Sequence, residues 1–422
     1  MLSRWLTFAL LCGFLFSMNV MGYGQKARPE DDSFLTNSAL TDGLDLAARK
    51  KFDQARTEFA KMLAYWQTYH TATLYVRIVD DVKDKTIKKK VAEKLFKAIR
   101  FSRNSEGKKA LKEVGKLVKK NKTYFPLLLS QADIFSALDD VEQAEAAYSK
   151  AIEISGGKAL CFLFRGKFYS VNNEPDKAIE DFAKAVTADS TLADAYFERG
   201  FALSLQGHYD AAIEDFQAAT QVYPAWGKSS IITETYFNRA VRSSEKKSYR
   251  KAIRDFSRAI ENDPDYLDSY LNRGVAYRNL KQFSKAVQDF DHCIAENGKF
   301  KDAYYNRGLI YYNRKKYTRA ATDLKAAVDL GSGDKKIIFK LAETYYQIEK
   351  YDQAIAQFNK VIALDPGYSW AYYWKGFSAE YSRKPKQAVV AFQNFLTRAP
   401  KQYYKQIAHA KVELKKLRKY IR

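Results

Sequence analysis

Cysteine, proline and glycine are all scarce in this 422-residue chain, which contains 3 Cys, 8 Pro and 19 Gly. A secreted disulfide scaffold carries a far higher proportion of cysteine, so that class is excluded. Cys161 and Cys293 are instead expected to be buried as small apolar side chains. Few helix breakers, together with 15% aromatic residues, predict a folded and almost entirely helical chain.

Catalytic and metal-binding motifs are also missing. The four histidines have no metal-ligand spacing, and the sequence contains no HExxH motif, phosphate-binding glycine loop or nucleophilic serine elbow. It also lacks the His-Pro-Asp tripeptide of a J domain, so a lumenal co-chaperone is only a third interpretation. The sequence therefore predicts a protein without catalytic activity, cofactor or bound metal.

The N-terminal 24 residues differ from the rest of the chain. Arg4 precedes an apolar run over residues 5–16, and small residues follow at 22–24. This order is typical of a cleaved secretory signal, so we expect an extracytoplasmic protein, periplasmic or secreted. An uncleaved N-terminal membrane anchor is the alternative. Residues 25–35 would form a linker.

A period of 34 residues dominates the remaining sequence. In the unit that starts at Ala193, the eighth residue is Gly200, the twentieth is Ala212, and the twenty-fourth is Phe216. The same frame fits units that start at Phe125, Ala159, Thr233, Leu267, Lys301, Lys335 and Ser369. Two apolar stripes of helical period in each unit predict two amphipathic helices, which must stack on neighbouring units to bury those stripes.

These small and aromatic positions resemble the tetratricopeptide repeat family. The resemblance implies an all-α fold, a right-handed α-solenoid of antiparallel helix pairs. Eight clear units would span residues 125–402, with a six-residue insertion at 227–232. Degenerate units are expected at 36–69 and 91–124, a basic irregular or helical insertion at 70–90, and a basic capping helix at 403–422.

An aspartate follows each of five arginines after sixteen residues, and units that lack the arginine also lack the aspartate. In an antiparallel helix pair these positions lie close together, so a guanidinium can form two parallel hydrogen bonds with the carboxylate. We predict structural ion pairs rather than ligand-binding arginines: Arg165–Asp181, Arg199–Asp215, Arg239–Asp255, Arg273–Asp289 and Arg307–Asp323.

The resemblance also implies that the first helix of each unit lines the concave face of the array. Its fifth and ninth positions are mostly apolar or aromatic, which favours a groove for an extended or helical partner segment. The family's carboxylate clamp of Lys, Asn and Arg is missing. Alternatively, some of these side chains belong to the core. The predicted groove residues are Leu163, Phe197, Phe201, Phe237, Val241, Leu271, Val275, Tyr305, Leu309, Phe339, Tyr373 and Phe377.

Positive charge is concentrated near the two ends of the array, within a net charge of +22. Such an excess is typical of nucleic-acid binding, but the expected export makes nucleic acid an unlikely partner. The lysine runs are either solvated helix faces or contacts for an anionic membrane, an envelope polymer or an acidic protein. We expect a non-catalytic scaffold or adaptor of the cell envelope, and its basic patch comprises Lys88, Lys89, Lys90, Lys108, Lys109, Lys119 and Lys120.

Overall fold

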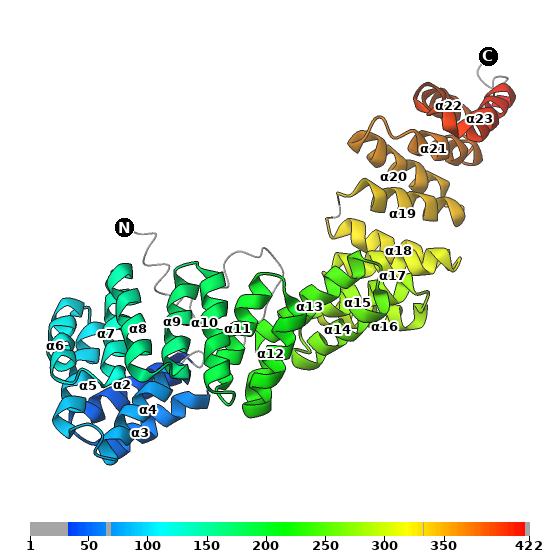
Figure 1. Ribbon diagram of the computed structural model, residues 1–422. Helices are drawn as coiled ribbons and strands as arrows, with labels where there is room; N and C mark the ends of the chain where they lie inside the picture. The colour runs from blue at the N-terminus through cyan, green and yellow to red at the C-terminus, as the bar shows by residue number, and fades with distance from the viewer. Residues whose placement is uncertain (1–32, 65–68, 332, 418–422) are drawn as a thin grey trace. The chain divides into compact units, whose positions relative to one another are not determined.

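The computed structural model describes residues 33–64, 69–331 and 333–417, without the side chains of residues 33–36, 64 and 69. The expected signal segment at 1–24 lies outside this range. All regular structure within the described residues is helical (Figure 1). The chain divides after Thr235 into an N-terminal unit and a C-terminal unit, which are described separately.

The N-terminal unit consists of helices joined by short turns, most of them packed as consecutive antiparallel pairs. The helix α13, Ser230–Glu245, continues from it into the C-terminal unit. The other elements are α2 Ser33–Ala48, α3 Phe52–Lys61, η1 Met62–Ala64, α4 Tyr69–Lys83, α5 Lys89–Arg103, α6 Gly107–Lys120, α7 Phe125–Ala137, α8 Val141–Ser155, α9 Ala159–Val171, α10 Pro175–Ala188, α11 Ala193–Leu205, α12 Tyr209–Val222 and η2 Pro224–Lys228.

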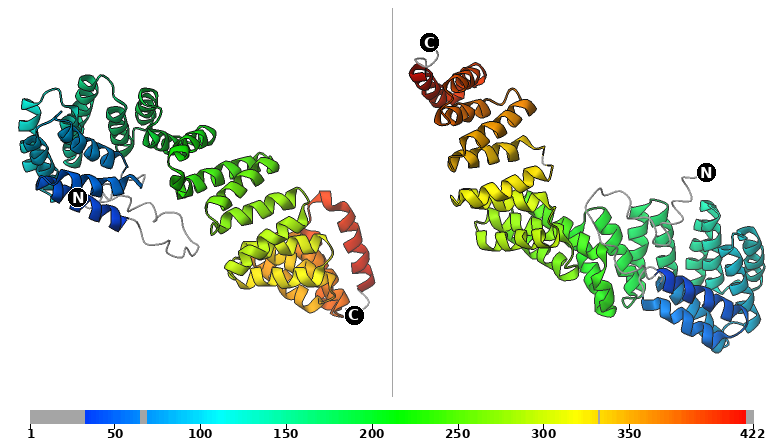
Figure 2. Two further views of the ribbon diagram at one scale, coloured as in Figure 1. Left: turned by 90° about the horizontal axis from the view of Figure 1, so that it is seen from below. Right: turned by 180° about the vertical axis from the view of Figure 1, so that it is seen from behind.

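The C-terminal unit repeats the same pairing, which Figure 2 shows from two further sides. Its last helix, α23, packs against α22. The elements that follow α13 are α14 Tyr249–Asn262, α15 Leu267–Asn279, α16 Phe283–Glu296, α17 Lys301–Asn313, α18 Tyr317–Asp329, α19 Lys335–Gln347, α20 Tyr351–Leu364, α21 Ser369–Tyr381, α22 Pro385–Arg398, η3 Lys401–Tyr403 and α23 Tyr404–Leu417.

The repeated glycine allows the two helices of a pair to approach closely. A Cβ atom added to Gly274 would lie 2.6 Å from the ring of Phe290, which is fully buried on the second helix of that pair. At Gly376 the corresponding distance to Phe392 would be 2.5 Å. The missing side chain at the eighth position therefore makes room for the aromatic ring at the twenty-fourth.

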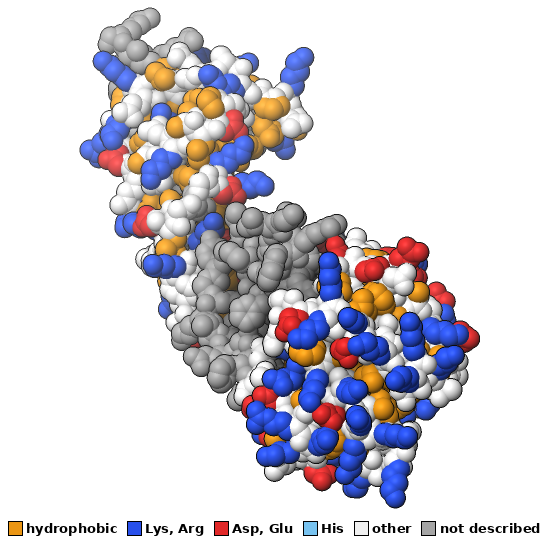
Figure 3. Space-filling view, turned by 90° about the vertical axis from the view of Figure 1, so that its left-hand side faces the viewer, with side chains coloured by type: hydrophobic (Ala, Val, Ile, Leu, Met, Phe, Trp, Pro, Cys, Tyr) orange, Lys and Arg blue, Asp and Glu red, His pale blue; other side chains and the backbone are white. Residues whose placement is uncertain are grey.

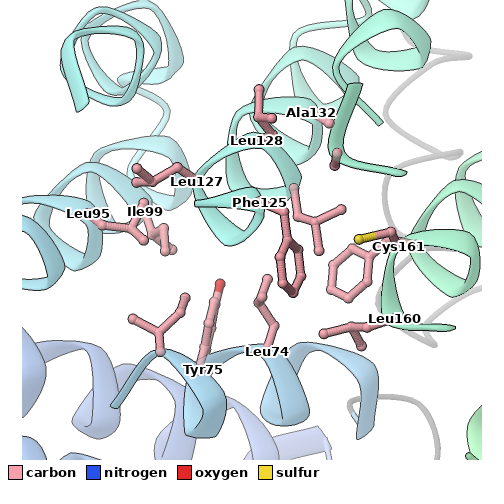
Figure 4. Close-up of a cluster of buried hydrophobic side chains, with 14 of the residues drawn as sticks. Leu74, Tyr75, Leu95, Ile99, Phe125, Leu127, Leu128, Ala132, Leu160 and Cys161 are labelled. Atoms are coloured by element: carbon pink, nitrogen blue, oxygen red, sulfur yellow. The ribbon is translucent and has the colours of Figure 1, made fainter. Parts of the chain in front are cut away.

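Helix α4 departs from the pairing. It packs against α3 and also contacts α5 and α9, which belong to later pairs. Figure 4 shows Leu74 of α4 directed toward Phe125, while Tyr75 extends toward Ile99 and Leu127. The insertion predicted at 70–90 is thus a buried helix that closes one side of the N-terminal unit. No helix in the described part of the chain is both long enough and apolar enough to span a membrane.

Candidate partner-binding face

The five ion pairs predicted from the sixteen-residue spacing are present. In each pair the guanidinium donates two hydrogen bonds, of 2.6–3.0 Å, to the two oxygens of its aspartate. The aspartates are only 2–8% exposed. Because a buried carboxylate needs a counter-charge, these pairs belong to the interior of each repeat.

Three of the arginines make a further bond that the sequence analysis missed. Arg165 donates through Nη1 to Ser149 Oγ at 2.9 Å, and Arg273 to Ser257 Oγ at 3.0 Å. Arg307 donates to Asp291 Oδ1 at 2.6 Å. Each acceptor lies on the second helix of the preceding pair, so the arginine joins consecutive repeats. Hydrogen bonds to Asp323 first, and to Asp291 in addition, raise the pKa of Arg307.

The structure separates the twelve predicted groove residues into two groups. Five are at most 9% exposed: Leu163, Phe197, Phe339, Tyr373 and Phe377. These five belong to the core, and the prediction that they line a groove is wrong. The other seven are half-buried: Phe201, Phe237, Val241, Leu271, Val275, Tyr305 and Leu309.

Aromatic packing within each pair contributes to the burial of the aromatic members of this group. The ring of Phe197 lies 5.1 Å from that of Phe216 and 5.6 Å from that of Trp226. Phe377 lies 5.0 Å from Phe392, the aromatic residue at the twenty-fourth position of its own unit. A large ring at the fifth or ninth position can therefore turn toward the second helix and join the core.

Six of the half-buried residues lie on three successive first helices of the C-terminal unit. We call this set the open stripe: Phe237 and Val241 on α13, Leu271 and Val275 on α15, and Tyr305 and Leu309 on α17. Residues three or four apart share one face of a helix. Because α15 and α17 are in direct contact, their parts of the stripe adjoin.

Polar side chains border the open stripe. Asn272 donates through Nδ2 to the backbone oxygen of Asp268 at 2.8 Å, and Asn306 donates to that of Asp302 at 2.7 Å. Arg278 of α15 donates through Nη1 to Asn306 Oδ1 at 2.6 Å, which links α15 to α17. Although Asp268 is exposed on the surface, partial desolvation by neighbouring atoms, and then the charge of Asp302, raise its pKa.

The corresponding face of α9 and α11 in the N-terminal unit is covered. His70, at the start of α4, lies with Nδ1 3.8 Å from Oδ2 of the fully buried Asp194. Its ring also contacts that of Phe164 on α9, at 5.3 Å between centroids. Beside them Lys167 is hydrogen-bonded to Glu198. Here α4 occupies the side that stays accessible on α13, α15 and α17.

Burial governs the charges of this covered cluster. It raises the pKa of Asp194 to about 7; Glu198 acts in the same direction, while Lys167 opposes the shift. Burial lowers the pKa of His70, and the charge of Lys167 adds to that effect. No sequence pattern predicts this cluster, because His70 lies far from the other members along the chain.

The predicted basic patch lies around the start of α5 and along α6. All seven of its lysines are solvent-exposed, and six of them form no ion pair with a described residue. The seventh, Lys109, is paired with Glu106 at 2.8 Å and lies over the ring of Phe101. Figure 3 shows lysine and arginine side chains crowded over one face of the N-terminal unit. We call the seven lysines the lysine face.

Five family models match stretches of the chain, described as tetratricopeptide repeat or TPR repeat. They cover residues 125–157, 193–226, 256–288, 277–335 and 342–378. The chain is a tetratricopeptide-repeat protein. Its helix pairs accordingly form a repeat array of the kind that the family uses to bind other proteins.

Among solved structures, the array is similar to a crystal structure of MamA protein, at 22% identity and a TM-score of 0.38, over 40% of this chain and 93% of that one. A MamA fragment from Desulfovibrio magneticus RS-1 is also 22% identical, with a TM-score of 0.37, over 39% and 93% of the two chains. No curated protein matches the sequence.

Proposed function

We propose that this tetratricopeptide-repeat protein is a non-catalytic scaffold that holds a segment of a partner protein on the open stripe. The observation that carries the proposal is the exposure of the stripe: three successive first helices leave six apolar side chains half-accessible. An apolar row bordered by polar groups suits an extended or helical segment anchored by its own apolar side chains.

The proposed place of action is the cell envelope. The apolar N-terminal run with its preceding arginine supports export, and an exported scaffold would meet its partners outside the cytoplasm. Detection of the processed chain after fractionation of cells, with the mature N-terminus sequenced, tests this part. An unprocessed chain in the cytoplasmic fraction would contradict it.

The binding proposal is tested by a triple variant, Phe237→Ala, Leu271→Ala and Tyr305→Ala. Cells would be treated with a short cross-linker before purification, and the captured proteins compared with those of the wild type. We expect loss of a specific partner, because anchor side chains contribute most of the binding energy at such interfaces.

A matched control distinguishes binding from folding. Val222, Leu364 and Val390 are exposed apolar residues on second helices, with 48–54% exposure. Alanine at these three positions removes a similar amount of apolar surface away from the stripe. A partner set that is identical for wild type, stripe variant and control, with all three proteins folded, would overturn the proposal.

The lysine face supports a second candidate function, a peripheral contact with an anionic membrane or an anionic envelope polymer. Exposed lysines without acidic partners attract such surfaces, and salt screens the attraction. The test is co-sedimentation of the purified protein with phosphatidylglycerol vesicles and with neutral phosphatidylcholine vesicles. Binding that is confined to the anionic vesicles and disappears in high salt is expected; equal binding to both would argue against this function.

A further inference from the structure

Two aspartates stand at one end of the open stripe. Asp268 and Asp302 occupy the second position of α15 and α17, next to Leu271 and Tyr305. Asp268 is exposed and Asp302 is half-buried. Neither side chain forms an ion pair within the described part of the chain. Two carboxylates on adjoining helices therefore border an apolar surface without a counter-charge.

A role in helix stability accounts for only part of this arrangement. An acidic residue in the first turn stabilises its helix, because it faces the positive end of the helix dipole. That effect explains an aspartate at the second position of either helix. It does not compensate the mutual repulsion of the pair, which contributes to the raised pKa of Asp268.

One arginine of α15 is already engaged by another side chain. Arg278 lies at the opposite end of α15, where it holds Asn306. The open stripe is thus acidic at one edge and apolar along its centre. A cationic group supplied from outside could neutralise the edge, while neighbouring apolar groups pack on Leu271, Val275, Tyr305 and Leu309.

The same repeat position in the N-terminal unit also lies beside nitrogen-bearing side chains. Asp194 has the same repeat position on α11 that Asp268 has on α15. It faces His70 of α4, and Lys167 lies nearby. Asp194, at the second position of its repeat, thus lies close to the side-chain nitrogens of His70 and Lys167, which belong to other helices.

From these observations we propose that the segment bound by the open stripe is cationic, with lysine or arginine side chains beside apolar ones. The inference rests on the proposed function, since it assigns partner chemistry to the same face. A cationic partner is the opposite of what the overall charge favours, since a net charge of +22 would by itself attract acidic segments.

The test uses the full chain and two synthetic peptides labelled with fluorescein, one alternating leucine with lysine and the other leucine with glutamate. Binding is measured by fluorescence anisotropy near physiological salt. We expect tighter binding of the lysine peptide. In the double variant Asp268→Asn and Asp302→Asn, its affinity should fall about tenfold, because two charge contacts are lost.

The control variant is Glu142→Gln with Glu296→Gln, which removes the same charge from exposed positions on the second helices α8 and α16. It should bind the lysine peptide as the wild type does. Circular dichroism and the melting temperature establish that all variants fold. Equal loss of affinity in the control and test variants would overturn the inference, because net charge alone would then explain the binding.

Two further outcomes separate this inference from the proposed function. If the glutamate peptide binds at least as tightly as the lysine peptide, and the stripe variant of Phe237, Leu271 and Tyr305 loses that binding, the face binds segments but the cationic assignment is wrong. If the stripe variant retains all lysine-peptide binding, while the aspartate variant loses it, the acidic edge acts without the apolar row and the proposed function fails.

Discussion

The same face of the repeat has different surroundings in the two units. On α9 and α11 the chain itself covers part of this face: α4 brings His70 to Asp194, and Trp226 packs on Phe197. On α13, α15 and α17 the corresponding positions remain half-accessible. A repeat position thus does not by itself specify a binding residue, because an added helix can convert a surface position into core.

The largest expected effect compares one repeat position across the two units. Phe197→Ala should cost about 3–5 kcal/mol of stability, since the ring is fully buried between Phe216 and Trp226. Phe237→Ala, at the same position of α13, should cost roughly 2 kcal/mol, because that ring is partly in solvent. Urea unfolding followed by circular dichroism gives both values. Equal costs would remove the distinction between covered and open faces.

Loss of a bridging arginine should come next. Arg273→Ala leaves the buried Asp289 without its partner and breaks the link to Ser257. We expect the unfolding free energy to fall by about 3 kcal/mol. This value is at the lower end for a broken buried ion pair, because the Arg273 side chain is 18% exposed. The double variant Arg273→Ala with Asp289→Ala should recover part of this loss. An unchanged unfolding midpoint in the single variant would contradict a structural role.

A pH experiment compares the two aspartates at position two. The folded-state pKa of Asp194 is about 7, above the ordinary 3.8, so folding favours its protonated form. The stability that this group contributes is therefore lost as pH rises from about 4 to 7, and Asp194→Asn removes that contribution. The unfolding free energy of the variant minus that of the wild type should be roughly 1–3 kcal/mol higher near pH 8 than at pH 5.

His70 and Lys167 face Asp194 from α4 and α9, and Glu198 faces it from α11. All three remain in the variant, so comparison with the wild type isolates the aspartate to a first approximation. The parallel substitution Asp268→Asn, on the exposed edge, should show a much weaker pH dependence. A pH-independent difference for Asp194→Asn would contradict the assigned shift.

The smallest effect on stability is expected on the lysine face. Lys108→Gln, Lys119→Gln and Lys120→Gln together should change the unfolding free energy by less than about 0.5 kcal/mol per site, since all three are exposed and unpaired among the described residues. Vesicle co-sedimentation should nevertheless weaken in the same variant. A large loss of stability would assign these lysines to the fold rather than to a surface contact.

Much of the repeat could be predicted because its determinants lie at fixed separations along the chain. Arg307 and Asp323 are separated by sixteen residues, and this separation places the two side chains next to each other in an antiparallel helix pair. The contact of Arg307 with Asp291 could not be predicted in the same way. Its counterparts are the serines at 149 and 257, so no constant residue type marks the position.

Five of the twelve predicted groove residues are buried, which the sequence pattern did not predict. Helical periodicity assigns Phe197 and Phe237 to the same face, yet one is buried and the other half-accessible. Both rings pack on the aromatic residues 19 and 29 positions later, Phe216 and Trp226 for Phe197 and Phe256 and Tyr266 for Phe237, so these contacts within the repeat do not explain their difference. The covered cluster was missed entirely, because His70 and Asp194 are more than a hundred residues apart.

The sequence by itself determined the helical pairs, the stacking period and the arginine–aspartate pairs, since each depends on spacing within one 34-residue unit. Only the tertiary structure decided which first helices keep an accessible face. The physical reason is that exposure depends on what else packs there, and α4 returns from another part of the chain to cover α9.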